Sequence, residues 1–179
     1  MHPLRFCPHC AQPLMERTFE ERPYLACPAK DCGFVHWDNP VPVVMAIVEY
    51  LQGDEVQGKI LLARNRAWEP GTLGLIAGYL EKGEWPEAAA EREVREETGL
   101  VAESVNLIGN YFFDRKNQVL LAYHIRARGE IFLNHELAEY RLFAPEDVPP
   151  LPTAIGRIMN DWLMRQFGIH QHNFPNIPQ

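Results

Sequence analysis

The stretch that decides the fold is GYLEKGEWPEAAAEREVREETGL, which runs from Gly78 to Leu100. It predicts one helix preceded by a glycine-containing loop. Pro86 suits the first helical turn, where the missing N–H costs nothing, and the alanines at 88–90 are strong helix formers. Gly99 stands where a left-handed C-terminal cap belongs. We therefore expect a helix that begins near Pro86 and ends before Gly99.

The glutamates of this helix share one face. Glu93, Glu96 and Glu97 are three and four positions apart, so their side chains point the same way. Carboxylates this close repel one another and raise one another's pKa, which calls for a compensating charge. Arg92 can pair with Glu96 one turn later, and Glu84 precedes the helix closely enough to reach the same cluster. Carboxylate oxygens suit Mg²⁺ or Mn²⁺, whereas the alternative interpretation is a solvated acidic helix.

The spacing of these residues matches a known motif. Gly78 is followed by five residues, Glu84, seven residues and then REVREETGL from Arg92 to Leu100. This is the Nudix box at every specified position, so the chain resembles the Nudix hydrolases. The resemblance implies an α+β architecture, an α/β/α sandwich around a mixed sheet. It also implies hydrolysis of a nucleoside diphosphate linked to a second group X, giving two phosphorylated products.

The resemblance also implies roles for the residues of the box. Arg92 would orient a glutamate, and Glu84 would be a secondary contact to metal or water. The general base is either Glu93 or Glu139 in ELAEYRLF, and a plain surface acid is the alternative for Glu139. The family's metal ligands carry over to Glu93, Glu96 and Glu97, with the backbone carbonyl of Ala77 as a further ligand.

The four cysteines all lie near the N-terminus. Cys7 and Cys10 form CPHC, and Cys27 and Cys32 form CPAKDC, an interval typical of a zinc ribbon. Four thiolates close a tetrahedral Zn²⁺ shell, so we expect a structural site. A section this short could not bury enough apolar surface to fold without such a metal site. A redox CxxC is the alternative.

The remaining elements follow from apolar periodicity. PVPVVMAIVEY and KILLARN predict two strands, ESVNLIGNYFF and QVLLAYHIRA a hairpin, and EYRLFAP a later strand. AGYLEKGE is expected to be a loop. A second helix is expected over about 152–168, with Thr153 as the candidate N-cap and a core-facing stripe at Ile155, Ile158, Met159, Trp162 and Leu163. We expect a zinc ribbon over 1–37, a Nudix domain over 38–168 and a surface tail over 169–179 that includes His170 and His172.

A zinc ribbon directly upstream of a Nudix domain resembles the NADH pyrophosphatase group and a related set acting on FAD or ADP-ribose. IAGYLEKGE, with Ala77 before the glycine, is similar to the same group. Members acting on NADH carry SQPWPFPQS after the box, where this chain has NYFFDRKNQ and retains only Gln118. Gln118 is therefore a candidate substrate contact. Tyr111 and Phe113 would either stack on a purine or flavin ring or pack in the core.

Composition narrows the classes of partner. The chain has 179 residues and a net charge of −7, which argues against a surface that coats nucleic acid but leaves room for a local basic groove. No apolar run could span a bilayer, and MHPLRFCPHC has no signal-peptide core, so we expect a cytoplasmic protein with reduced thiols.

Three functions agree with these features. The first is a metal-dependent pyrophosphatase acting on a nucleotide-type small molecule. The second is a regulator that senses a nucleotide without cleaving it, and the third is an RNA-directed enzyme that removes an NAD cap. By analogy with relatives, the protein could be a homodimer.

Overall fold

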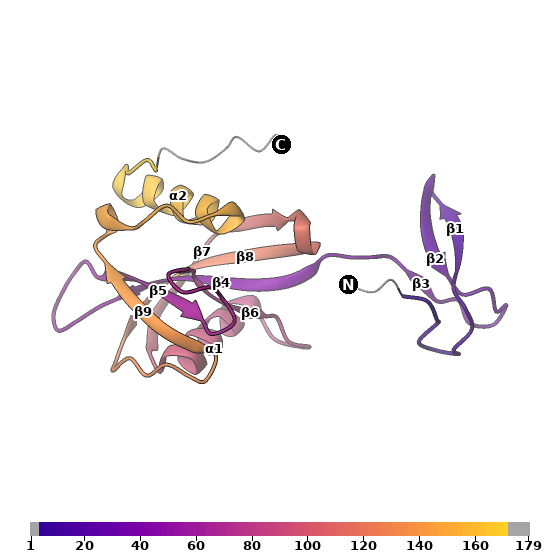
Figure 1. Cartoon of the computed structure of the whole chain (residues 1–179), viewed down its shortest axis with the longest axis horizontal. Coiled ribbons are helices and arrows are strands. Elements are labelled where there is room, and N and C mark those ends of the chain that lie inside the picture. The colour runs from indigo at the N-terminus through magenta and orange to yellow at the C-terminus, as the bar shows by residue number, and fades with distance from the viewer. Residues whose placement is uncertain (1–3, 172–179) are drawn as a thin grey trace. The chain divides into compact units, whose positions relative to one another are not determined.

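The computed structural model describes residues 4–171 and divides the chain into two compact units, with the boundary between Pro40 and Val41 (Figure 1). The end of the expected tail, including His172, lies outside the described residues.

The N-terminal unit is a small antiparallel sheet that carries the cysteines. Its strands are β1 (Met15–Phe19), β2 (Arg22–Ala26) and β3 (Val35–His36), in the order β1-β2-β3. Cys7 and Cys10 precede β1, and Cys27 and Cys32 lie between β2 and β3. This arrangement is compatible with the zinc-ribbon module expected from the cysteine spacing.

The second unit is built on a mixed sheet of six strands. The strands are β4 (Val41–Tyr50), β5 (Lys59–Asn65), β6 (Ile76–Tyr79), β7 (Val101–Phe113), β8 (Gln118–Arg128) and β9 (Leu137–Phe143). The order is β7-β8-β4-β5-β9, and β6 pairs with β4. β4 and β8 run parallel, while the other pairs are antiparallel. The predicted mixed sheet is thus confirmed.

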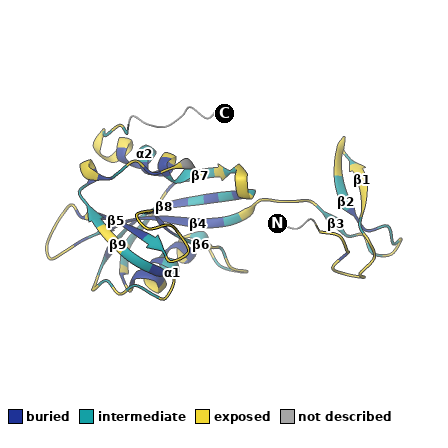
Figure 2. Ribbon diagram, viewed as in Figure 1, coloured by how far each residue is buried: buried dark blue, intermediate teal, exposed yellow. Residues whose placement is uncertain are grey.

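Two helices cover opposite faces of this sheet, α1 (Pro86–Thr98) and α2 (Thr153–Phe167) (Figure 1). The alternation of side chains along β4 explains the layering, because successive residues of a strand point to opposite faces. Val43, Met45 and Ile47 pack in the cluster that includes α2. Val44, Ala46 and Val48 pack in the cluster that includes α1. The buried strands between the helices complete the expected α/β/α sandwich (Figure 2). Two short 3₁₀ helices, η1 (Asp114–Lys116) and η2 (Pro145–Asp147), join neighbouring elements.

The local signals of α1 are confirmed, whereas the expected N-cap of α2 is off by one residue: Pro152 is the N-cap and Thr153 is the first residue of the helix. Pro86 is the first residue of α1, and Gly99 ends it in the left-handed conformation with φ 73°. α2 ends at Gly168 with φ 69°. The predicted stripe of α2 packs on the sheet, with Trp162 among its buried members. Full burial of each aliphatic side chain in this stripe contributes roughly 1.5–3 kcal/mol to stability.

One expectation was partly wrong: AGYLEKGE was expected to be a loop, but its first three residues belong to the strand β6 (Ile76–Tyr79). It pairs antiparallel with β4, which places Ala77 opposite Met45 and Gly78 opposite Val44. The segment contains Ala and Gly and no β-branched run, so strand propensity gives little signal there. Its strand character comes from the partner strand, which lies more than thirty residues earlier in the chain.

Candidate active site

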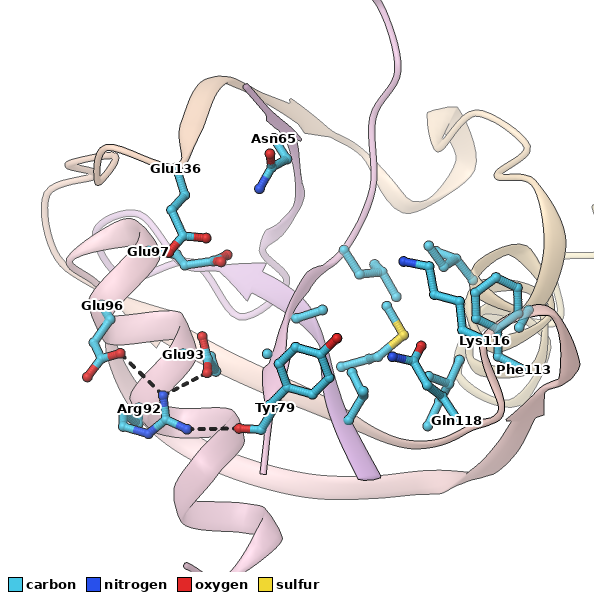
Figure 3. Close-up of a pocket in the computed structure, with 18 of the residues that line it drawn as sticks. Asn65, Tyr79, Arg92, Glu93, Glu96, Glu97, Phe113, Lys116, Gln118 and Glu136 are labelled. Atoms are coloured by element: carbon cyan, nitrogen blue, oxygen red, sulfur yellow. Dashed lines mark hydrogen bonds and ion pairs between the residues drawn. The ribbon is translucent and has the colours of Figure 1, made fainter. Parts of the chain in front are cut away.

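A cavity of about 610 Å³ opens beside α1 (Figure 3). Its wall comes from β4, β6 and α1, the hairpin end of β7 and β8, the start of α2 and the loops before β6 and β9. One part is acidic, lined by Glu81, Glu93, Glu96, Glu97 and Glu136. Another part is largely apolar, lined by Val43, Met45, Leu75, Phe113, Leu120 and Ile155. The cavity therefore combines a strongly charged region with a surface suited to a planar or apolar group.

Arg92 joins the loop before α1 to the helix itself. Its Nε and Nη2 donate to the two carboxylate oxygens of Glu84 at 2.8 and 3.0 Å. Its Nη1 donates to Glu93 at 2.7 Å and to Glu96 at 3.2 Å, and Nη2 also donates to the Tyr79 carbonyl at 3.3 Å (Figure 3). The predicted ion pair between Arg92 and Glu96 is therefore present. The hydrogen bonds from Arg92 hold the pKa of Glu84 below its usual range despite partial burial.

Glu93 lies directly against the backbone of β6. A Cβ added to Gly78 would sit 1.9 Å from Glu93 Oε1, so only glycine leaves room for this carboxylate. Burial raises the pKa of Glu93. Arg92 offsets part of that effect, while the negative charges of Glu96 and Glu136 add to it. The glycine of the box therefore has a steric purpose, which is to let the helix carboxylate approach the strand that carries Ala77.

Among the acids that line the cavity, Glu97 has the least favourable surroundings for its charged form. It is only 7% exposed, and within residues 4–171 no hydrogen bond or ion pair joins its carboxylate to a cationic side chain. Burial, reinforced by the charges of Glu93, Glu136 and Glu96, raises its pKa to about 8. A buried carboxylate in this position stays ionised only if a cation neutralises it.

The cavity fits a divalent cation of the hard, oxygen-binding type. Its acidic part offers the carboxylate oxygens of five glutamates, and carboxylate oxygens are preferred ligands of Mg²⁺ and Mn²⁺. Ala77, whose carbonyl was the expected additional ligand, lies on the wall beside Gly78. Arg92 Nη1 donates to both Glu93 and Glu96, and among the described residues the cavity glutamates do not form a group of three with ligand oxygens all within 4.8 Å of one another.

Glu136 is a cavity residue that the sequence did not single out. The segment before β9 is docked on the end of α1, where Asn134 N–H donates to the Glu97 carbonyl at 3.1 Å and Phe132 N–H donates to the Thr98 carbonyl at 2.9 Å. Asn134 Oδ1 in turn accepts from Glu136 N–H at 2.9 Å. These bonds bring Glu136 close to Glu97 at the acidic end of the cavity (Figure 3).

Glu139 lies elsewhere. It is on β9, where its Oε1 accepts from Arg64 Nε at 3.1 Å, and it is not among the residues that line the cavity. The segment ELAEYRLF contains both acids: the pairing of β9 with β5 places Glu139 opposite Arg64, and the docking of the preceding segment on α1 places Glu136 near Glu97.

The expected substrate contacts also fall into two groups, those that line the cavity and those that do not. Gln118 and Phe113 line the cavity, together with Lys116, which was not predicted (Figure 3). Tyr111 does not line it. Its hydroxyl donates to Asp161 on α2 at 3.0 Å, and its ring packs against the core, which corresponds to the core alternative for this residue.

The four cysteines converge in the N-terminal unit. All are free thiols, and their Sγ atoms lie within 4.8 Å of one another, with Cys7–Cys32 and Cys10–Cys27 at 3.5 Å. A tetrahedral Zn²⁺ with bonds near 2.3 Å requires sulfurs about 3.8 Å apart. The cluster can therefore hold a metal ion. In the part of the chain that is described, it is the only such group of cysteine, histidine or acidic side chains with ligand atoms this close.

The family profile of the NUDIX domain matches residues 41–165, and the chain belongs to this family. Over nearly the whole chain it is also similar to two bacterial proteins called NAD-capped RNA hydrolase NudC. That of Stutzerimonas stutzeri is 34% identical, over 92% of this chain and 58% of the relative. That of Pseudomonas putida is 30% identical, over 96% and 60%. The chain thus spans about 60% of the length of these relatives.

A solved structure supports the same assignment. The crystal structure of a NUDIX hydrolase from Nitrosomonas europaea superposes with a TM-score of 0.75 and 25% identity, covering 93% of this chain and 94% of that one. No helix within the described residues has the length and hydropathy needed to cross a membrane.

We predict that Gly78→Ala weakens Mn²⁺ binding at least about 10-fold, because the added methyl group displaces the Glu93 carboxylate from β6. The melting temperature should change little, since the displaced atoms are the end of a flexible side chain. Gly109→Ala is the matched control, because its Cβ would make ordinary contacts of 3.6 Å with Tyr111. Calorimetric titration measures the affinity, and unchanged Mn²⁺ binding in Gly78→Ala would contradict the steric argument.

We also predict a pH effect from Glu97 in metal-free protein. Its pKa is about 8 when folded against an ordinary 4.5, so the folded state binds more protons between these values. The free energy of unfolding should therefore fall as pH rises from about 5 to about 8. Glu97→Gln should flatten this slope, and Glu91→Gln, a change on the same helix away from the cavity, should not. Denaturant titrations with chelator at several pH values test this, and equal slopes in all three proteins would refute it.

Proposed function

We propose that this protein is a metal-dependent pyrophosphatase that hydrolyses a nucleoside diphosphate linked to X, such as NADH, FAD or ADP-ribose, to two phosphorylated products. The observation that carries the proposal is the acidic end of the cavity, where the buried Glu97 carboxylate has no cationic side-chain partner among the described residues. A pyrophosphate carries charge of the same sign as this wall, so it could bind there only through metal ions. The cavity volume is within the range of small-molecule sites.

We assign Mg²⁺ or Mn²⁺ to Glu93, Glu96 and Glu97, with the Ala77 carbonyl as a further ligand. When bound, such an ion would offset phosphate charge and lower the pKa of an attacking water. Arg92 would hold Glu93 and Glu96 in orientation through Nη1, and Glu84 would hold Arg92 through both of its carboxylate oxygens.

We assign the general base to Glu136, with Glu93 as the alternative. Glu136 lines the cavity beside Glu97 and, within the described chain, its carboxylate has no cationic partner, so it could accept a proton from water. Glu139, the acid favoured with Glu93 from sequence, is paired with Arg64 outside the cavity wall.

We assign a structural Zn²⁺ to the four cysteines, in a cytoplasmic protein whose thiols stay reduced. Four sulfur ligands leave no open coordination position, which is why we give this ion no part in hydrolysis.

A second candidate substrate is NAD-capped RNA, in which NAD is joined to the end of an RNA chain. The observation that favours it is the name shared by the relatives from S. stutzeri and P. putida, which match more than nine tenths of this chain. The chemistry at the pyrophosphate would be the same for both substrates.

We expect the purified protein with Mg²⁺ or Mn²⁺ to convert at least one of NADH, NAD⁺, FAD, ADP-ribose and NAD-capped RNA into two monophosphate products, separated by chromatography. Glu96→Gln should lower kcat at least about 100-fold without unfolding the protein, because it replaces an anionic carboxylate ligand of the metal ion with a neutral amide. Glu91→Gln is the control on the same helix and should retain activity. Full turnover by Glu96→Gln would overturn the assignment of the metal site.

We expect one zinc per chain in the purified protein, measured by elemental analysis. Cys10→Ser should lose that zinc and the structure of the N-terminal unit, because a small unit depends on its metal for folding. Glu97→Gln should keep the full zinc content, which separates the two metal sites. Wild-type protein whose N-terminal unit is folded and zinc-free would argue against the ribbon.

A further inference from the structure

The loop between β5 and β6 has features that the proposed hydrolysis does not use. Trp68 lies on this loop, lines the cavity and is 39% exposed despite its size. Its six-membered ring rests on Gly74, where an added Cβ would be 2.8 Å from Cζ3 and 2.9 Å from Cη2. Gly74 is itself fixed to β5 by two hydrogen bonds with Ala63, at 2.9 and 3.0 Å. The indole therefore rests on the backbone at Gly74, which two hydrogen bonds to β5 hold in place. Another part of the indole faces the cavity.

Asn65 lies at the end of β5, and its carbonyl accepts from Trp68 N–H at 3.0 Å. The pairing of β5 with β9 shifts here, because Arg64 is opposite Glu139, Asn65 is opposite Leu137, and Ala138 of β9 is skipped. Asn65 lies just past this bulge and lines the cavity (Figure 3). Asn65 Oδ1 accepts from Ala67 N–H at 2.9 Å, which leaves the two Nδ2 hydrogens as donors toward the cavity.

Two arginines hold the loop in place. Arg64 donates through Nε to Glu139 at 3.1 Å and through Nη1 to the Trp68 carbonyl at 3.3 Å. Arg66 donates through Nε to the His135 carbonyl at 2.8 Å, and its backbone N–H donates to the Glu136 carbonyl at 2.8 Å. The β5–β6 loop is thus tied to the segment that carries Glu136. The loop would therefore lose little conformational freedom when a ligand binds.

We infer that this loop is the recognition site for the nucleobase of the substrate, with Trp68 as the stacking surface and Asn65 as a hydrogen-bond donor to a ring nitrogen or carbonyl. Glu139 is a positioning residue that acts through Arg64 on Trp68. A planar heteroaromatic ring satisfies both groups at once, since it offers a π-face to indole and an acceptor to the amide. The inference rests on the proposed function and adds to it the end of the cavity at which the base is bound.

This location differs from the aromatic residues expected from sequence. Phe113 lies with Lys116 and Gln118 on the other side of the cavity from Asn65 and Glu136 (Figure 3). The two sides can therefore accept different halves of a two-part substrate, and Phe113 remains available to the group X.

The test is binding of products rather than turnover. Calorimetry with Mn²⁺ present compares AMP, GMP, CMP, UMP and nicotinamide mononucleotide with ribose 5-phosphate, which has the sugar and phosphate but no base. We expect at least one mononucleotide to bind about 10-fold more tightly than ribose 5-phosphate. Trp68→Ala should remove that preference, Trp68→Phe should retain most of it, and Asn65→Asp should reduce it. Absence of a preference in the wild type, or its survival in Trp68→Ala, overturns the inference.

The role of Glu139 is tested in the same assay. Glu139→Gln should weaken mononucleotide binding several-fold while leaving ribose 5-phosphate binding unchanged, which a general loss of structure would not do. Glu146→Gln, on the exposed face of η2, is the charge-matched control. Equal effects on both ligands, or none, would refute the positioning role. Since none of these ligands contains a pyrophosphate, failure of the proposed hydrolysis would show only in the product assay.

Discussion

The guanidinium of Arg92 is the constraint on which the rest of the site depends. It is planar, permanently charged and presents several donors in a fixed geometry, so one side chain binds acceptors from both the loop and the helix. Through Glu84 and the Tyr79 carbonyl it fixes the end of β6 and the turn that follows. Through Glu93 and Glu96 it fixes the exposed face of α1. Without this cation, three carboxylates and a carbonyl would converge with nothing to hold them together.

Arg92 compensates only part of the negative charge around it. Glu97 and Glu136 lie beside one another at the acidic end of the cavity (Figure 3), without a cationic partner among the described residues, and Glu97 is buried. Such an arrangement costs stability, and the packing of α1 on the sheet through Val94 and its alanines must offset that cost. Function and stability are opposed here because the same charges that weaken the metal-free fold would hold a metal ion.

Substrate specificity and the acidic end of the cavity come from different parts of the chain. The box supplies α1 and its loop, whereas the residues that could distinguish substrates come from the β5–β6 loop, the segment before β9 and the β7–β8 hairpin. These connections vary independently of the sheet and helices that position them, which is how one scaffold serves several substrates.

The sequence by itself determined the elements whose signals are local. Pro86, Gly99 and the alanines between them defined α1, spacing of three and four put its acids on one face, and cysteine spacing predicted the cluster of four thiols. Only the tertiary structure decided that Ile76–Tyr79 is a strand, that Glu136 rather than Glu139 faces Glu97, and that Trp68 and Asn65 line the same cavity. These outcomes depend on strand register, on a bulge between β5 and β9 and on hydrogen bonds between distant segments. A shift of one residue in register reverses which side chains face the site, and no short stretch of sequence specifies register alone.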